Sequence, residues 1–216
     1  MERPEAIRRL TALVGRDLRP LAEDYGITIF IDAPNRGTSI VETHLNKGWA
    51  GHTIERFLGL PLNSCQAPNF GSWELKVVPL VKRQDGRIVM KETMAITMLD
   101  PVEVEQKSFE DSHVYGKLRK IVVLARLYSD RFETCSHVYS VGAFDLDDPA
   151  IYSLVKADYD LIRKAIRTTG FESLTGRMGK LVQPRTKGPG HGSVSRAFYA
   201  RKEFVAHIIG LKAFDL

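Results

Sequence analysis

Apolar residues recur every three or four positions in four stretches of the chain, which is the spacing of one face of an α-helix. These stretches cover residues 4–23, 47–58, 149–168 and 195–209. Asp148 and Pro149 supply an N-cap and a first-turn proline for the third stretch, and Gly170 is placed to end it. We therefore expect four helices, one of them long and well capped.

Runs rich in β-branched and aromatic residues lie between these stretches and predict strands. The expected strands cover residues 27–31, 73–81, 88–98, 120–128, 132–144 and 179–186. The turn sequence Gln84-Asp85-Gly86-Arg87 joins the second and third of them and predicts a β-hairpin. The glycine-rich residues 187–192 are expected to form a flexible loop. The order of these elements predicts a mixed α/β core.

The size and charge of the chain narrow the classes of function. Its 216 residues are enough for one well-buried domain or for two lobes around a cleft. The 44% hydrophobic and 26% charged content is typical of a soluble globular protein. A formal charge of +5 suits a polyanionic partner without requiring one. Basic residues gather toward the C-terminus, where residues 177–202 contain seven lysines and arginines and no glutamate.

The two cysteines, Cys65 and Cys135, are far apart and form no CxxC pair. This pattern fits reduced thiols and argues against a zinc site or a disulfide framework. The first 21 residues alternate charged with apolar positions, and no stretch is long and apolar enough to span a bilayer. We expect a cytoplasmic protein of bacterial type without a membrane partner.

The segment from Gln66 to Lys76 contains the most specific chemistry. Glu74 and Lys76 lie two residues apart on an expected strand, so their side chains share one face, while Leu75 and Val77 point the other way. A carboxylate beside an ammonium, with an oxygen ligand upstream, is typical of a Mg²⁺ site that activates water for phosphodiester hydrolysis. Asn69 occupies the upstream position, where a metal-binding aspartate is expected.

Four further residues have both a functional and a structural interpretation. Glu55 could complete a metal site from a neighbouring helix, or it could be a solvated helix carboxylate. Lys117, placed at the start of an expected strand, could contact a phosphate or could be part of a basic strand edge. His191 could approach a nucleic-acid groove or could simply lie in a mobile loop. Tyr199, among cations, could touch a base edge or could have no role.

Five segments, in this order, resemble the MutH family, which comprises the methyl-directed nicking endonuclease of mismatch repair and its restriction-endonuclease relatives. The segments extend over most of the chain from about residue 47. They are Lys47-Gly-Trp-Ala-Gly with Glu55 and Leu58-Gly59, Asn69-Phe70 with Trp73-Glu-Leu-Lys-Val-Val-Pro79, Ser112-His-Val-Tyr-Gly-Lys-Leu118, Gln183-Pro-Arg-Thr-Lys187, and Arg196-Ala-Phe-Tyr-Ala-Arg-Lys202.

The resemblance implies an α/β fold of the PD-(D/E)xK, restriction-endonuclease-like type, with a mixed sheet flanked by helices and two lobes around a DNA-binding cleft. The single endonuclease domain, residues 1–216, would comprise a catalytic lobe at about 45–145 and a DNA-recognition lobe at about 146–216 together with the N-terminal helix.

The family pattern also assigns roles to residues. Glu74, Glu55 and the Asn69 position would hold Mg²⁺, Lys76 would position or deprotonate water, and Lys117 would act near the scissile phosphate. The DNA-binding residues would be Lys47, Arg185, Lys187, His191, Arg196, Tyr199 and Lys202. Arginine and lysine at 185 and 187 could bond guanine in the major groove, and Tyr199 matches the aromatic position near the adenine whose methylation the family senses.

Asn69 departs from this pattern, because asparagine keeps the shape of aspartate and loses its charge, which weakens metal binding. Either the chain is an engineered, catalytically silent form, which we favour because the other catalytic positions keep their chemistry, or it is a naturally slow nuclease. The expected activity is that of a type II restriction-like endonuclease at a GATC-like site.

The alternatives are a methyl-directed nicking enzyme of mismatch repair and a module that binds DNA without cutting. The partners would be duplex DNA and, functionally, a cognate DNA methyltransferase, with the protein a monomer or a transient dimer.

Overall fold

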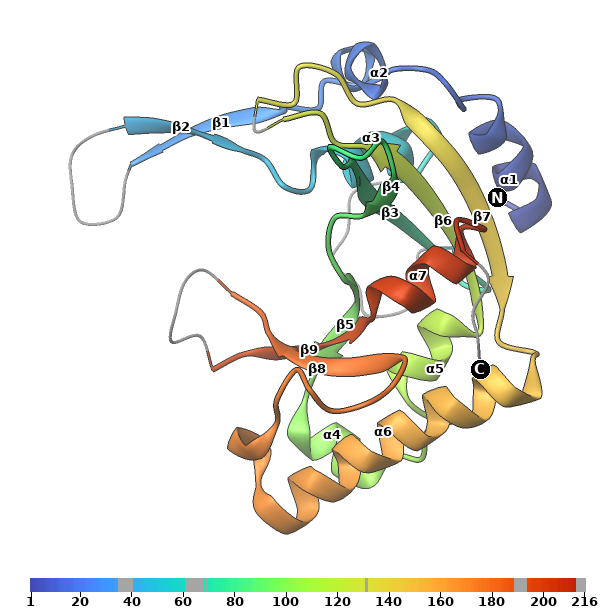
Figure 1. Cartoon of the computed structure of the whole chain (residues 1–216), viewed down its shortest axis with the longest axis vertical. Helices are drawn as coiled ribbons and strands as arrows, with labels where there is room; N and C mark the ends of the chain where they lie inside the picture. Colours follow the sequence, from blue (N-terminus) through green and yellow to red (C-terminus); the bar gives the residue numbers. More distant parts are fainter. Residues whose placement is uncertain (35–40, 61–67, 69, 131, 189–193, 213–216) are drawn as a thin grey trace.

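The computed structural model describes the chain except residues 35–40, 61–67, 69, 131, 189–193 and 213–216 (Figure 1). The helices are α1 (Arg3–Thr11), α2 (Leu18–Asp24), α3 (Trp49–Phe57), α4 (Pro101–Gln106), α5 (His113–Leu118), α6 (Pro149–Thr169), the short 3₁₀ turn η1 (Phe171–Ser173) and α7 (Lys202–Ile208). The strands are β1 (Phe30–Pro34), β2 (Val41–Leu45), β3 (Glu74–Lys82), β4 (Ile88–Met90), β5 (Met94–Leu99), β6 (Lys120–Leu127), β7 (Val138–Asp145), β8 (Val182–Thr186) and β9 (Arg196–Ala200).

The strands form three sheets, which Figure 1 shows as separate parts of the molecule. A four-stranded sheet has the order β4-β3-β6-β7, a three-stranded sheet has the order β5-β9-β8, and β1 and β2 form a two-stranded ribbon. The pair β3–β6 is parallel, whereas β3–β4 and β6–β7 are antiparallel. The expected α/β class, a mixed sheet flanked by helices, is confirmed. No described helix meets the length and apolarity needed to cross a membrane.

The four-stranded sheet is buried on both faces, which explains the nearly continuous apolar sequence of β6. Val122 and Leu124 of β6 pack with residues of α1, α2 and α3, whereas Val123 and Ala125 pack with residues of α5, α6 and α7. The expected hairpin is present, since Leu80 of β3 pairs with Met90 of β4.

The N-terminal region contains two helices where the apolar pattern predicts one. Gly15 adopts a φ of +83°, a left-handed conformation that glycine tolerates and that ends the helical path. Its N–H donates to the carbonyl of Val138, and the N–H of Val138 donates to Arg16. Helix α1 packs on β6 and β7, where Arg3 donates to the carbonyls of Ile121 and Phe144. The N-terminal helix therefore lies against the four-stranded sheet.

The expectation of one helix over residues 195–209 is wrong. Residues 196–200 form the central strand of the three-stranded sheet, where Phe198 pairs with Thr97 of β5 and Pro184 of β8, and only residues 202–208 are helical. The sequence Arg-Ala-Phe-Tyr-Ala has no clear local preference, so pairing with two distant strands decides its conformation.

Two of the other expected strands also differ. Residues 88–98 split into β4 and β5, which belong to different sheets. The strand expected from 132 starts only at Val138.

Candidate active site

Strand β3 places Glu74 and Lys76 on one face, as the period of two predicts. Leu75 and Val77 point to the opposite side and pack with the cluster formed around α1, α2 and α3. The Glu74 side chain is fully buried, with an exposed fraction of 0%, and its Oε1 lies 2.7 Å from Nζ of Lys76. A buried carboxylate of this kind needs a charge partner, and Lys76 provides one.

Lys117 supplies a second ammonium to the same carboxylate oxygen. Its Nζ lies 3.1 Å from Oε1 of Glu74, and its side chain is buried. The expectation that Lys117 opens a strand is wrong, because it lies in the last turn of α5. Ser112 precedes this helix as its N-cap, and its hydroxyl accepts a hydrogen bond from the N–H of Tyr115. Lys117 and Glu74 are thus in contact although they are 43 positions apart in the sequence.

The surroundings of Lys76 make its ammonium group easier to deprotonate. Burial lowers the pKa of Lys76 below the ordinary value of 10.5, and the charges of Lys117 and Lys187 lower it further. The contact with Glu74 acts in the opposite direction and does not cancel the effect of burial. Lys76 therefore gives up its proton more readily than an exposed lysine.

A groove of about 710 Å³ opens over Lys76 between the two larger sheets. Four cationic residues line it: Lys47, Lys76, Arg185 and Lys187. They come from the turn before α3, from β3, from β8 and from the residue after β8. A concave surface on which positive charges outnumber negative ones attracts a polyanion.

Arg185 and Tyr199 lie together on the side of this groove that β8 and β9 form. The guanidinium of Arg185 donates to Oγ1 of Thr93 at 3.0 Å, and its Cζ lies 5.9 Å from the centroid of the Tyr199 ring. Burial raises the pKa of Tyr199, so its hydroxyl keeps its proton and can donate a hydrogen bond. The side chain of Tyr199 projects from a strand and not from the helix that the sequence pattern predicts.

Two groove residues escaped the sequence analysis. Glu92 and Thr93 line the groove just before β5 begins, and Glu92 is an acid among the cations there. Glu92 and Thr93 reach the groove because β5, which follows them, pairs with β9. No local sequence pattern predicts this pairing.

Two of the residues expected to bind DNA, Lys202 and Arg196, lie outside the groove. Lys202 lines a different pocket, between β4 and α7, and donates to the carbonyl of Lys91 at 2.6 Å. Arg196 stacks over Phe171, with its Cζ 5.3 Å from the ring centroid, and contacts Glu172. Neither residue is among those that line the groove. Asn69 and His191 lie outside the residues that the structure describes.

Glu55 is half-buried on α3, the helix that packs against β3. Within the described part of the chain, no group of three or more His, Cys, Asp or Glu side chains is arranged to hold a metal ion. Glu74 and Glu55 nevertheless offer carboxylate oxygens from neighbouring elements, which is the donor chemistry that Mg²⁺ prefers. The donor types present fit such an ion, and residue 69 is the position from which a third oxygen is expected.

The chain is similar to proteins of known activity. The family model of the DNA mismatch repair enzyme MutH matches residues 58–164, a range that contains Glu74, Lys76 and Lys117. The MutH protein of Shewanella woodyi is 28% identical over 197 residues, covering 89% of this chain and 78% of that protein. The MutH protein of Haemophilus influenzae strain 86-028NP is 25% identical over 226 residues, covering 97% and 94%.

Among solved structures, the complex of the restriction endonuclease MvaI with its cognate DNA substrate covers 88% of this chain and 94% of that chain. The sequence identity is 13% and the TM-score is 0.36.

Proposed function

Because this chain is related to the MutH-type endonucleases, we propose that it is a DNA endonuclease that hydrolyses phosphodiester bonds at a short specific site in duplex DNA. The observation that carries this proposal is the convergence of Lys76 and Lys117 on the buried carboxylate of Glu74 at one side of a basic groove. The four cations of the groove would neutralise phosphates along the backbone, which supplies affinity without sequence preference.

The proposed reaction is an in-line attack of water on phosphorus that leaves a 5′-phosphate and a 3′-hydroxyl. Glu74 and Glu55, together with residue 69, would hold Mg²⁺, which when bound supplies charge neutralisation at the phosphate and acidifies water. Lys76 would orient the attacking water and accept its proton, a role that its lowered pKa favours. Lys117 would place a fixed positive charge where negative charge develops on the phosphate.

Recognition of the site would come from the other side of the groove. Arg185 presents a planar fork of donors of the kind that binds guanine O6 and N7. Tyr199 beside it would lie near an adenine and respond to its methylation, which favours a GATC-like site. Lys47 and Lys187 would contact phosphates. Contacts from His191, Arg196 and Lys202 remain predictions, and so does the division into catalytic and recognition lobes.

Asn69 bears directly on the activity of this sequence. The amide carries no charge, so Mg²⁺ would bind more weakly than to a site with aspartate at this position. We therefore expect cleavage by this chain to be slow or absent and the variant Asn69→Asp to be active. A plasmid carrying GATC sites, methylated or unmethylated, is digested by both proteins with Mg²⁺, and the ends are sequenced. An inert Asn69→Asp protein that still binds DNA would contradict the assignment.

The main alternative is a module that binds DNA without cutting it. Two features favour it: Glu74 is already neutralised by two lysines, and the third ligand position is uncharged. Specific binding in EDTA, with no cleavage in Mg²⁺ even after Asn69→Asp, would support this alternative. If the variant does cut, the product distinguishes two types of enzyme: nicked circles indicate a methyl-directed nicking enzyme, and linear DNA indicates a restriction-like enzyme.

A further inference from the structure

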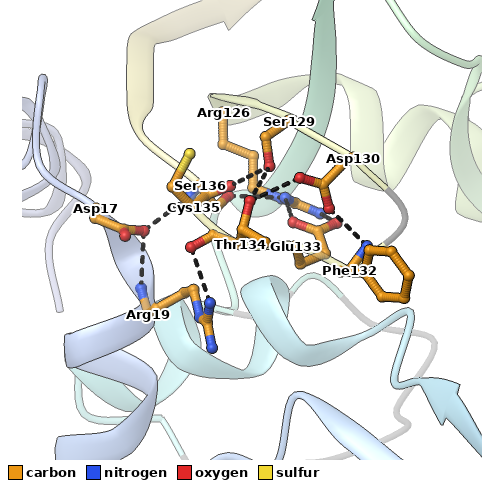
Figure 2. A network of polar contacts seen from close by, with 10 residues as sticks. All are labelled: Asp17, Arg19, Arg126, Ser129, Asp130, Phe132, Glu133, Thr134, Cys135 and Ser136. Atoms are coloured by element: carbon orange, nitrogen blue, oxygen red, sulfur yellow. Dashed lines mark hydrogen bonds and ion pairs between the residues drawn. The ribbon is translucent and has the colours of Figure 1, made fainter.

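A buried ion pair lies beneath the start of helix α3. The guanidinium of Arg126, on β6, donates to both carboxylate oxygens of Glu133, at 2.7 and 3.0 Å, and to the hydroxyl of Ser136 at 2.8 Å (Figure 2). Arg126 is 6% exposed and Glu133 is fully buried. The Cζ of Arg126 also lies 5.1 Å from the centroid of the Trp49 ring, so the pair is covered by this tryptophan.

Glu133 lies in the loop between β6 and β7, and its backbone conformation is unusual. Glu133 has a φ of +47°, and among the described residues it is the one non-glycine with a positive φ. Such a conformation is unfavourable for glutamate and persists only where its surroundings impose it. Hydrogen bonds to Asp130 stabilise this loop conformation. The Asp130 carboxylate accepts from the N–H of Phe132 and from the hydroxyl of Thr134, both at 2.7 Å.

The same loop is fixed to the N-terminal region. Asp17, the N-cap of α2, accepts the N–H of Ser136 at 2.8 Å, and Arg19 donates to the carbonyl of Thr134 at 2.8 Å (Figure 2). The loop that carries Glu133 is thus hydrogen-bonded to the start of α2 at two places. Replacing a buried ion pair by apolar residues is often neutral for stability, so stability alone is a weak reason for this arrangement.

Trp49, which packs on the guanidinium of Arg126, connects the ion pair to the groove. Trp49 is the first residue of α3, is fully buried, and follows directly after Lys47 and Gly48, which line the groove. On the other side of this turn, Asn46 accepts the N–H of Gly48 at 3.2 Å and donates to the carbonyl of Thr28 at 2.8 Å. The groove wall is therefore held at one end by Asn46 and at the other by the Trp49 ring.

We propose that Arg126 and Glu133 are positioning residues, which hold Trp49 and thereby place Lys47 against the DNA backbone. The proposal rests on the proposed function, because Lys47 has to be a DNA contact. The backbone of Arg126 pairs with Pro79 of β3, which lines the groove, whereas its side chain contacts Trp49, which directly follows Lys47 and Gly48. Replacing the side chains of the ion pair should therefore act on Lys47 through Trp49 and the turn that precedes it.

The test combines DNA affinity with a signal from Trp49 itself. Affinity for a fluorescent duplex containing GATC is measured in EDTA by anisotropy, with the chain as it is and with Arg126→Met/Glu133→Met. We expect the melting temperature to stay close to that of the parent and the affinity to fall about tenfold, the scale of one lost charge-assisted contact. Arg3→Met, which removes a pairing between α1 and β7, is the control: it should lower stability and leave the affinity unchanged.

A double-mutant cycle separates positioning from a general structural effect. In a Lys47→Ala background the Arg126→Met/Glu133→Met change should cause little further loss of affinity, because both act through the same contact. Fully additive losses, or parent affinity in the doubly substituted protein, would overturn the proposal. Should that protein fail to fold, Arg126→Lys takes its place in the cycle, since it keeps the charge and loses the two-pronged contact.

The Trp49 signal keeps this test distinct from a test of the proposed function. Trp49 and Trp73 are the two tryptophans, so Trp73→Phe leaves Trp49 as the one fluorophore of its kind. Its emission should shift when Arg126 and Glu133 are replaced, whether or not the protein binds DNA. An unchanged emission would overturn the proposal, whereas a shifted emission with no DNA binding by any variant would instead count against the proposed function.

Discussion

Nζ of Lys117 on α5 lies 3.1 Å from the carboxylate of Glu74 on β3, although the two residues are 43 positions apart in the sequence. The contact completes a triangle with Lys76, whose Nζ is 2.7 Å from the same oxygen. One buried negative charge is thus shared by two positive charges. With both lysines protonated, the cluster carries a net positive charge, and Lys76 is the member that lines the groove.

Replacing Lys117 should impair cleavage more than folding. In an Asn69→Asp background, Lys117→Met removes the fixed charge expected near the phosphate, and we expect cleavage to fall by about 10²-fold or more. Stability should fall by about 1–3 kcal/mol, because Lys76 still pairs with Glu74. Cleavage rates and urea unfolding measure the two effects. Lys164→Met, at an exposed position of α6, is the matched control and should change neither.

Replacing Glu74 should abolish cleavage and destabilise the fold. Glu74→Ala leaves two ammonium groups facing each other without their buried carboxylate, and we expect a loss of about 3–5 kcal/mol of unfolding free energy. Glu74→Gln keeps the shape and should cost less, while it remains inactive. Urea denaturation compares the two variants. Equal stability of Glu74→Ala and the parent would show that the carboxylate is not the charge partner described here.

The pH dependence of cleavage should follow the protonation of Lys76. Because burial lowers the pKa of Lys76, the neutral form that accepts a proton becomes populated below 10.5, and the rate should rise with pH through this range. Initial rates of the Asn69→Asp protein are measured across pH. Lys76→Arg, which stays charged, should be inactive throughout, and an unaltered pH profile in this variant would exclude Lys76 as the base.

The same pKa shift predicts a change of stability with pH. Between the lowered pKa of Lys76 and its ordinary value of 10.5, the unfolded chain binds more protons than the folded one. The contribution of Lys76 to stability therefore rises as pH increases through this window, and below it the full cost of burying the charged form remains. The unfolding free energies of the parent and of Lys76→Met are measured across this pH range. The parent value minus the variant value should increase with pH, and a decrease would contradict the prediction.

Arg185 should control base discrimination. Arg185→Lys keeps the charge and loses the planar fork, so preference for the cognate site should fall by about 1–3 kcal/mol while non-specific affinity changes little. Competition binding with the GATC duplex and with duplexes substituted at the guanine measures the preference. Arg177→Lys, an exposed position outside the groove, is the matched control. Equal losses on all duplexes would identify Arg185 as a phosphate contact.

Part of the site could be predicted because it depends on short-range geometry. The shared face of Glu74 and Lys76 follows from the alternation of a strand, and both residues occupy it. The long helix α6 was also predicted closely, since Asp148, Pro149 and Gly170 mark its ends. Local sequence sets these features, and the tertiary fold does not override them.

The remaining errors come from long-range contacts. The strand character of residues 196–200 arises from pairing with β5 and β8, which no local pattern reveals. The helix that carries Lys117 was missed although Ser112 is a typical N-cap, because the helix is short and a strongly apolar strand follows it. Glu92 and Thr93 reach the groove only through the same pairing of β5 with β9.

The chain passes from the four-stranded sheet to the three-stranded sheet through Lys91, Glu92 and Thr93, between the end of β4 and the start of β5. Two of these three residues line the groove itself. The connection between the two sheets is therefore part of the groove surface. If DNA occupies the groove as proposed, we expect it to contact this three-residue connection, so that lengthening the connection should disturb DNA binding more than an equal insertion at the exposed turn Asp85-Gly86.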